Sequence, residues 1–546
     1  MRISIGGGEL CGIAGFVGRG EIDVSPRLEA MAAAMHHRGP DDRGVAAEST
    51  AGITMQRLSI VGIETGSQPI FSEDRRFAIV GNGEIYNAPE LRKELEARGH
   101  RFRGASDIES ILHLFEERGT DAFSALNGMF GIAVWDRHTG RVTIARDRLG
   151  IKPLFYGDFP SGIGFASELP SLLAALSPGE RRAVEVDPTR VHEVLRHGYI
   201  TSPGTIYRNV HRLPAGHWVN LDAQGASEPQ AWWILPEYTP ESRSLDAFAE
   251  EAEALLRHSV QLRTLGDVPP GAFLSGGLDS GTVVSLLTET LGHGVPCFTI
   301  AFDDAGLDEA EDAARTAAEF GCPHHVERLD SVGIDELDEL FAQFGEPFAD
   351  VSLLPMHRVS KLAAGHVKYV LSGDGGDELF AGYAWLTREV QLRSLPSALR
   401  GTARLLSPLL RHGQRATGSG LLGKAMRTVG DLASSTTDSF LRRRSLGSRS
   451  LLAGFAGPAL EEALTRSTTL ERFAAEAPPG WETLLDLDRR YYLPGDILEK
   501  VDRATMFHSL EARVPSSNAS IQFLWGKIDP ISASPARRFI DRVFRY

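Results

Sequence analysis

Residues 275–280 read Ser275-Gly276-Gly277-Leu278-Asp279-Ser280. A short apolar run at 271–274 precedes them, and a run of small and apolar residues at 281–287 follows. This order predicts a strand, a glycine loop and a helix. Adjacent glycines let backbone N–H groups close around an anion, and the positive end of a helix favours negative charge. The stretch therefore predicts a pyrophosphate-binding loop, with Asp279 placed to hold a magnesium ion that bridges phosphate oxygens.

The loop differs from the Walker pattern, which needs a Lys after its last glycine, because Leu278 follows Gly277 here. It resembles the PP-loop of enzymes that split ATP between the α- and β-phosphates, release pyrophosphate and adenylate a carboxylate. A second glycine loop, Ser372-Gly373-Asp374-Gly375-Gly376-Asp377, follows the run Lys368-Tyr369-Val370-Leu371. Residues 297–302 and 368–371 both read as buried parallel strands.

The N-terminal part carries a separate series of motifs, which begins with Cys11-Gly12-Ile13-Ala14-Gly15-Phe16. Further motifs follow: Gln56-Arg57-Leu58-Ser59-Ile60-Val61, Gly81-Asn82-Gly83-Glu84-Ile85-Tyr86-Asn87, Ser106-Asp107, and residues 145–156 and 165–169. Their order and spacing are similar to those of class II glutamine amidotransferases. Together with the PP-loop, they make residues 11 to about 515 resemble the glutamine-hydrolysing asparagine synthetase family.

That resemblance implies a glutamine site around Cys11. The Cys11 thiol would be the nucleophile and its own α-amino group the base, since an α-amino pKa of about 8 suits proton transfer near neutral pH. The Asn82 side chain and the Gly83 N–H would bind the oxyanion. Arg57 would hold the glutamine carboxylate through a bidentate fork, with Asp107 and Glu84 near the ammonium. The implied glutamine-binding set is completed by Leu58, Ser59, Ile60 and Val61.

The resemblance also implies roles at the ATP site. Asp377 would join Asp279 at magnesium, Asp374 would handle the acyl-adenylate and the incoming amine, and Lys500 would neutralise phosphate charge. The implied ATP-binding residues are Leu274, Ser275, Gly276, Gly277, Asp279, Ser280, Ile300, Ser372 and Gly373. Leu274 and Ile300 are expected to flank the adenine.

Bulk properties agree with a large cytoplasmic enzyme. The chain has 546 residues, 42% hydrophobic and 24% charged, which suits two or three domains with ordinary cores. Its net charge of −15 argues against nucleic acid or an anionic membrane as a partner. Three widely spaced cysteines exclude a disulfide scaffold and favour a reducing compartment.

The family's architecture sets the expected fold. A four-layer αββα domain of the N-terminal-nucleophile type is expected over residues 11–225, with helices near 27–35 and 89–97. A polar, turn-rich linker is expected at 226–243. An α/β PP-loop domain with a Rossmann-like parallel sheet is expected over 244–515, and an amphipathic helix from Leu245 would lead into it. A homodimer is an assembly that the family allows.

The expected reaction is an ATP-dependent carbon–nitrogen ligation. Glutamine would be hydrolysed at Cys11, and the ammonia would attack an adenylated carboxylate near Asp374, with aspartate as the default acceptor. Two alternatives stay open: a different acceptor, such as a sugar acid or a secondary metabolite, and a truncated member with glutaminase activity only. Relatives that close β-lactam rings typically lack the cysteine and the glutamine-binding residues. The presence of Cys11 and Arg57 therefore argues against a ring-closing enzyme.

Both ends of the chain depart from the family. Cys11 cannot use its own amine while residues 1–10 are attached, so these residues are expected to be a removed leader or an incorrectly assigned start. After Pro515 the family pattern continues as Phe-Leu-Asp, whereas this chain reads Ser516-Ser517-Asn518. Residues 516–546 are therefore expected to be an atypical tail, and the loss of one T from Phe-Leu codons would explain Ser-Ser.

Overall fold

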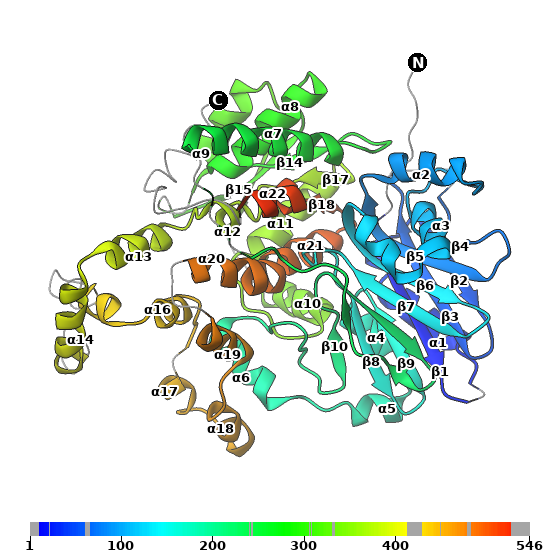
Figure 1. Ribbon diagram of the computed structural model, residues 1–546, viewed down its shortest axis with the longest axis horizontal. Helices are drawn as coiled ribbons and strands as arrows, with labels where there is room; N and C mark the ends of the chain where they lie inside the picture. The colour runs from blue at the N-terminus through cyan, green and yellow to red at the C-terminus, as the bar shows by residue number, and fades with distance from the viewer. Residues whose placement is uncertain are drawn as a thin grey trace.

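The computed structural model describes residues 10–20, 22–60, 66–237, 239, 241, 244–304, 306, 308–329, 333–411, 428–447, 449–477 and 482–525. Figure 1 shows two parts: an antiparallel sandwich near the N-terminus and a helix-covered parallel sheet beyond it. Within these ranges, no helix is both long and apolar enough to cross a membrane.

The sandwich consists of two antiparallel sheets. The first runs in the order β10 (Val210–Arg212), β8 (Phe155–Phe159), β9 (Gly162–Ala166), β1 (Leu10–Gly18), β3 (Ala51–Leu58) and β2 (Asp42–Ala47). The second runs β12 (Gly225–Ala226), β11 (His217–Asp222), β7 (Arg141–Arg146), β6 (Gly128–Asp136), β5 (Phe77–Ile85) and β4 (Ile70–Phe71), and β13 (Gln230–Ala231) pairs with β11. Alternating residues of facing strands, such as Ile13, Ile53, Val80 and Trp135, are buried between the sheets.

Helices cover both outer faces of the sandwich (Figure 1). Helices α1 (Ser25–Ala34) and α4 (Leu169–Ala174) pack on the first sheet through Leu28, Met31 and Leu172. Helices α2 (Ala88–Ala97) and α3 (Ile108–Arg118) pack on the second sheet. The shorter elements are η1 (His36–Arg38), η2 (Gly119–Ala125), α5 (Pro178–Ala183) and α6 (Pro188–His197). The four layers confirm the predicted αββα class, and α1 and α2 lie where helices were expected.

The second part is built on a parallel sheet. Its order is β16 (His324–Leu329), β15 (Cys297–Phe302), β14 (Gly271–Phe273), β17 (Tyr369–Leu371) and β18 (Glu511–Arg513), and every neighbouring pair is parallel. The surrounding helices are α7 (Leu245–Arg263), α8 (Leu278–Leu291), α9 (Ala310–Glu319), α10 (Ile334–Phe344), α11 (Leu353–Ala364) and α12 (Gly376–Phe380). This confirms the predicted α/β class. β15 and β16 lie on one side of β14, and β17 and β18 lie on the other, so the strand order changes direction at β14. Parallel sheets have a crevice at such a point, and it is expected here where β14 and β17 end.

The described residues between 384 and 506 are largely helical. Their elements are α13 (Ala384–Ser394), α14 (Ser397–Arg411), α16 (Thr436–Arg443), α17 (Arg449–Leu452), α18 (Pro458–Leu464), α19 (Thr469–Glu476), α20 (Glu482–Leu487), the π-helix η3 (Asp488–Ile497) and α21 (Leu498–Met506). Figure 1 shows α13 and α14 extending away from the body of the molecule. Short helices η4 (Pro515–Ser517) and α22 (Ala519–Trp525) follow β18, and the side chains of Ile521 and Leu524 are buried in the core that also holds α7 and α8.

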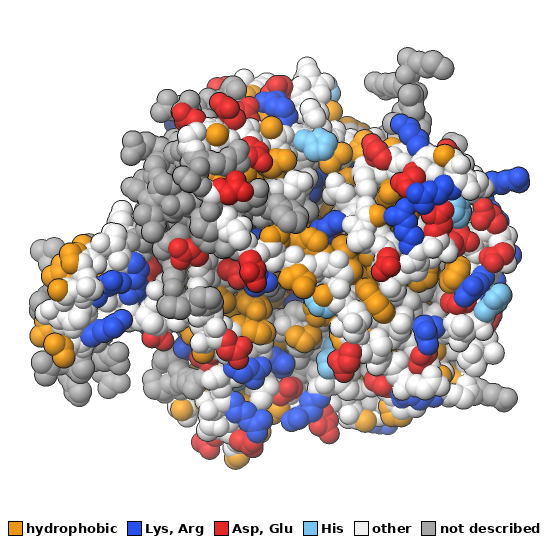
Figure 2. Space-filling view, viewed as in Figure 1, with side chains coloured by type: hydrophobic (Ala, Val, Ile, Leu, Met, Phe, Trp, Pro, Cys, Tyr) orange, Lys and Arg blue, Asp and Glu red, His pale blue; other side chains and the backbone are white. Residues whose placement is uncertain are grey.

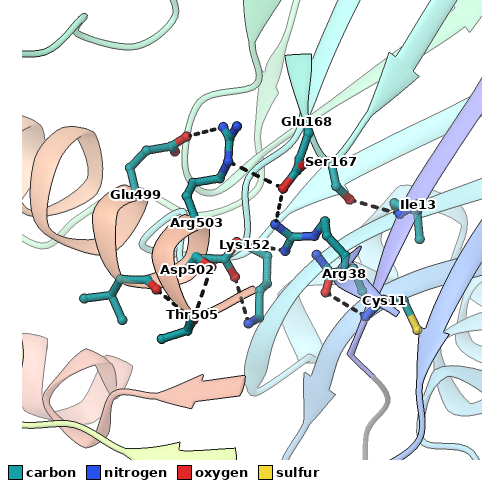
Figure 3. Close-up of polar contacts among 12 residues, drawn as sticks. Cys11, Ile13, Arg38, Lys152, Ser167, Glu168, Glu499, Asp502, Arg503 and Thr505 are labelled. Carbon is teal, nitrogen blue, oxygen red and sulfur yellow. Dashed lines mark hydrogen bonds and ion pairs between the residues drawn. The ribbon is translucent and has the colours of Figure 1, made fainter. Parts of the chain in front are cut away.

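Buried ion pairs join the sandwich to α21 (Figure 3). Arg38 of the sandwich contacts Glu168 at 2.9 Å and Asp502 of α21 at 2.8 Å. Lys152 contacts the other oxygen of Asp502 at 3.1 Å, and Arg503 approaches Glu168 at 3.5 Å. All five side chains are at most 3% exposed. Although burial alone would raise it, Arg38 and Lys152 lower the pKa of the Asp502 carboxyl. The two parts are therefore joined by charges that have no access to water.

The predicted domain boundaries and both terminal segments stay predictions. Residues 1–9 and 526–546 lie outside the described part of the chain. Of the expected atypical tail, residues 516–525 are described. Ser516 Oγ donates a hydrogen bond to the Asp374 carbonyl, and Ser517 Oγ accepts one from Arg263 at 3.2 Å.

Candidate active sites

Cys11 lies on β1 at the point where the two sheets of the sandwich face each other. It pairs with Arg57 of β3, and its backbone N–H donates a 3.2 Å hydrogen bond to the side-chain oxygen of Asn82 on β5 (Figure 3). Cys11 and Asn82 are fully buried, and Arg57 is 2% exposed. The predicted nucleophile, oxyanion donor and carboxylate-binding arginine therefore come together from three strands and both sheets.

Asn82 and Gly83 have the features that an oxyanion site needs. The Asn82 side-chain nitrogen is buried and has no hydrogen-bond partner among the described residues. A buried donor without a partner is costly, and a developing negative charge would satisfy it. Gly83 has φ +138°, and a side chain there would overlap the Met129 carbonyl of β6. The strand can take this path only with glycine at position 83.

Asp107 ends the loop before α3, next to β5. Its Oδ2 accepts a 2.6 Å hydrogen bond from the Ile85 N–H, while its Oδ1 is buried without a hydrogen-bond partner in the described chain. Burial raises the pKa of this carboxyl to about 7, despite N–H donors from Ile85 and Ile108. An ammonium group beside Oδ1 would supply both the missing donor and a compensating charge.

The other predicted glutamine-binding residues have different surroundings. Glu84 forms a buried ion pair with Arg513 of β18, at 2.6 Å, so its carboxylate contacts the parallel-sheet domain. Leu58 and Ile60 belong to a hydrophobic cluster that includes Phe248 of α7. The Ser59 N–H donates to Asp41, and Val61 lies outside the described residues. Direct glutamine contacts by these five residues stay predictions.

The protonation state of the Asp107 carboxyl should affect the KM for glutamine. Below pH 7 the carboxyl is largely protonated, so the KM for glutamine should fall about tenfold for each pH unit as pH rises toward 7. Asp107→Asn should raise KM about 10- to 100-fold with a smaller change in kcat, and should remove this pH dependence. Initial rates of glutamate release between about pH 6 and 9 would measure both effects.

The exposed Asp121→Asn on η2 is the matched control, and its KM should keep the wild-type pH profile. If Asp107→Asn keeps the wild-type pH profile of KM, another group causes the pH dependence.

The second site is a cavity of about 910 Å³ at the carboxyl ends of the parallel strands. It opens where β14, β15 and β17 end, and α21 and η3 form its opposite wall. Its lining includes the predicted residues Leu274, Ser275, Gly277, Asp279, Ser280, Ile300, Ser372, Gly373, Asp374, Asp377 and Lys500. Segments far apart in sequence thus meet around one space large enough for a nucleotide and an acceptor.

Among the predicted ATP-binding residues, Gly276 does not line the large cavity. Its N–H donates a 3.1 Å hydrogen bond to Glu309, and it lines a smaller neighbouring cavity with Glu253 and Glu319. Within the same loop, Ser280 Oγ accepts from the Ser275 N–H at 3.1 Å, which fixes the turn into α8. Glu309 also lines the large cavity, so it must release the Gly276 N–H before that group can bind phosphate.

The two glycine loops contact each other through their backbones. A side chain on Gly376 would lie 2.5 Å from the Asp279 carboxyl carbon, and one on Gly373 would lie 2.7 Å from the Ser280 nitrogen. Burial, with the negative charges of Asp377 and Asp374, raises the pKa of Asp279 to about 7. Burial also raises the pKa of Asp377. Crowded carboxylates of this kind fit a divalent cation with oxygen ligands, which would offset their repulsion.

Lys500 extends from α21 into the cavity. Its Nζ lies 2.9 Å from Asp350 and 2.7 Å from Ser352. Although burial disfavours the charged form, Asp374 and Asp350 raise the pKa of the Lys500 ammonium. The ammonium is therefore held charged at the cavity wall, which suits a group that meets phosphate oxygens.

The sequence interpretation left out several groups at this cavity, including Asp350, Ser352 and Tyr383. Asp350 belongs to the run Glu346-Pro347-Phe348-Ala349-Asp350, which could have indicated it. Tyr383 donates a hydrogen bond to the Glu378 carboxylate. No sequence signal singled out that pair, because it depends on how the chain turns after α12.

Comparisons with known proteins agree with this arrangement. Residues 10–233 match the family model described as glutamine amidotransferase domain, and residues 251–521 match the one described as asparagine synthase. These two domains in one chain define an ATP-dependent ligase that hydrolyses glutamine. Asparagine synthetase [glutamine-hydrolyzing] 1 of Bacillus subtilis is 30% identical over 516 residues, which cover 93% of this chain and 79% of that protein. The chain belongs to the glutamine-hydrolysing asparagine synthetase family.

Two further similarities are more limited. Amidase chyE of Penicillium rubens is 32% identical over 385 residues, which cover 66% of this chain and 55% of that protein. A solved structure of glutamine phosphoribosylpyrophosphate amidotransferase from B. subtilis, complexed with ADP and GMP, aligns at 14% identity with a TM-score of 0.32. That alignment covers 66% of this chain and 81% of the other.

Proposed function

We propose that the chain is a glutamine-dependent asparagine synthetase, which joins ammonia from glutamine to aspartate at the expense of ATP. The observation that carries this proposal is the pair of sites on either side of α21. Lys500 of this helix lines the large cavity, while Asp502 and Arg503 of the same helix form ion pairs with the sandwich that holds Cys11.

In the first half-reaction, the Cys11 sulfur attacks the glutamine side-chain carbonyl. The α-amino group of Cys11 accepts the thiol proton and passes it to the leaving ammonia. Asn82 Nδ2 and the Gly83 N–H stabilise the oxyanion, and Arg57 and Asp107 hold the α-carboxylate and α-ammonium of the substrate. Water then attacks the thioester carbonyl and releases glutamate.

In the second half-reaction, the acceptor carboxylate attacks the α-phosphorus of ATP, and pyrophosphate leaves. The loop residues Ser275 and Gly277 and the ammonium of Lys500 stabilise charge on the phosphate oxygens. Magnesium held by Asp279 and Asp377 would neutralise the pyrophosphate as it departs. The nitrogen of ammonia then attacks the carbonyl carbon of the acyl-adenylate, and AMP leaves. Asp374 accepts the proton that this nitrogen loses.

Product analysis tests this proposal. With glutamine, aspartate, ATP and Mg²⁺, the chain should form AMP, pyrophosphate, glutamate and asparagine in equal amounts. Formation of ADP with aspartate as acceptor would contradict the PP-loop assignment. The control reaction omits aspartate and should release little pyrophosphate.

A different acceptor carboxylate is the second candidate, because a protein named as an amidase matches two thirds of the chain at 32% identity. Pyrophosphate release should therefore be screened against aspartate and a panel of sugar acids and other carboxylic acids. A preferred substrate other than aspartate would favour the second candidate. Release of glutamate without pyrophosphate for any acceptor would favour an enzyme with glutaminase activity only.

A further inference from the structure

Four potential metal ligands meet on the outer helical layer of the sandwich, away from β1 and the large cavity. They are Glu73 in the turn between β4 and β5, His100 between α2 and α3, and His113 and Glu116 on α3. One ligand atom from each lies within 4.8 Å of the others. His113 Nδ1 is 2.8 Å from Glu116 Oε2, and His100 Nδ1 is 3.9 Å from the same oxygen.

The remaining nitrogen of each imidazole faces a further carboxylate. His100 Nε2 lies 3.3 Å from Glu117 Oε1, and His113 Nε2 lies 3.9 Å from Glu109 Oε1. Glu109 is itself fixed by the N–H groups of Arg103 and Gly104, at 2.7 and 3.0 Å. A carboxylate behind each histidine is the arrangement that orients metal-bound imidazoles, since it fixes the tautomer and raises the basicity of the ligating nitrogen.

The burial of His113 is a second indication. Its side chain is 2% exposed, and its Nε2 has no hydrogen-bond partner among the described residues. A purely structural histidine at such a position is expected to have both nitrogens satisfied. With a metal on Nδ1, Nε2 carries the proton and points at Glu109, and a small closing movement of that carboxylate would complete the hydrogen bond.

We propose that Glu73, His100, His113 and Glu116 bind one divalent transition-metal ion, and zinc is the best chemical match. Two imidazole nitrogens and two carboxylate oxygens suit tetrahedral Zn²⁺, whose ligand atoms lie about 2.0–2.2 Å from the ion and therefore about 3.3–3.6 Å apart. The separations of 2.8 and 3.9 Å bracket that value. Magnesium and calcium prefer all-oxygen sets, so they fit this cluster poorly.

Such an ion would have a structural role. It would join α3 to the chain between α2 and α3 and to the β4–β5 turn, all in the layer where Figure 2 shows acidic, basic and histidine side chains gathered over α2, α3 and β4. Helix α3 begins one residue after Asp107, so the ion would also hold the helix that positions this carboxylate.

Zinc titration of the chelator-treated full chain tests the proposal. The Cys11→Ala background removes a thiolate that would bind zinc on its own, and excess Mg²⁺ occupies the carboxylates of the large cavity. In this background the parent chain should bind one tight equivalent of Zn²⁺, measured against a chromogenic chelator. His100→Gln and Glu116→Gln, both at partly exposed positions, should weaken this equivalent about 100-fold.

The control is His293→Gln, an exposed histidine after α8, which should bind zinc as its parent does. Glu109→Gln removes only the carboxylate behind His113 and should weaken binding about tenfold. Zinc should also raise the Tm of the parent and of His293→Gln, and should not raise the Tm of His100→Gln. Equal zinc stoichiometry and affinity in all variants, or no tight equivalent in the parent, would overturn the proposal and leave the cluster as polar contacts between histidines and glutamates.

Discussion

Cys11→Ala should abolish glutamine hydrolysis while leaving ammonia-dependent synthesis intact. Loss of a covalent nucleophile should reduce the rate of glutamate release at least about 10³-fold, because the remaining oxyanion donors have no attacking atom to assist. The measurement is glutamate and pyrophosphate release from one preparation, supplied first with glutamine and then with ammonium chloride. Both forms should be prepared with residue 11 as the first residue, so that the α-amine is free.

Cys322→Ala is the matched control, because it removes a buried cysteine of the parallel-sheet domain and should keep glutaminase activity. A chain with Met1 still attached should be inactive toward glutamine, since its Cys11 nitrogen is part of a peptide bond. Full glutaminase activity of Cys11→Ala would refute the assignment of Cys11 as the nucleophile. Full activity of the chain that retains Met1 would refute the assignment of the Cys11 α-amino group as the base.

Asp279→Asn should reduce pyrophosphate release about 10²- to 10³-fold while making the chain without ligands more stable. The loss of rate follows from removing a charged oxygen at the phosphate loop. The stability gain follows from the raised pKa of about 7 for Asp279. Between about pH 4 and 7 the folded chain keeps a proton that the unfolded chain has lost, so the free energy of unfolding falls as pH rises through this window.

Thermal unfolding at several pH values would measure the stability effect. The Tm advantage of Asp279→Asn over wild type should be absent near pH 4, grow until about pH 7 and then stay constant, at roughly 2–4 °C for each kcal/mol regained. Mg²⁺ with ATP should raise the Tm of wild type more than that of the variant. Asp338→Asn, an exposed change on α10, should alter neither rate nor pH dependence. A variant that is less stable than wild type at pH 8 would contradict the proposed crowding of carboxylates.

Sequence motifs predicted the loops better than the contacts between distant segments. The Ser275–Ser280 and Ser372–Asp377 loops lie together as expected, because parallel strands present their carboxyl ends at one edge. Neither the Glu84–Arg513 ion pair nor the hydrogen bond from Gly276 to Glu309 could be predicted. Each depends on how separate segments dock in three dimensions, and no local pattern encodes that.

The helical stretch after Leu386 and the His100–His113 cluster illustrate the same limit. The sequence between residues 386 and 481 has helical periodicity but no assignable motif, and the described residues in this range form helices without revealing a role for most of them. The cluster combines a turn, a loop and one helix face, with a spacing that matches no common metal-binding pattern.

The buried charges around Asp502 limit how this enzyme can be recombined with its relatives. A chimera that combined its sandwich with a foreign synthetase domain would enclose Arg38, Lys152 and Glu168 without their partners on α21. Arg38 and Glu168 would still pair with each other, but Lys152 would lose Asp502. An unpaired buried charge costs about 3–5 kcal/mol, which is a large share of the stability of a typical domain. Crossover points that keep residues 499–503 with the sandwich's own Arg38, Lys152 and Glu168 should give folded hybrids. A change of acceptor carboxylate is therefore best engineered within the large cavity, and exchange of whole domains should fail more often.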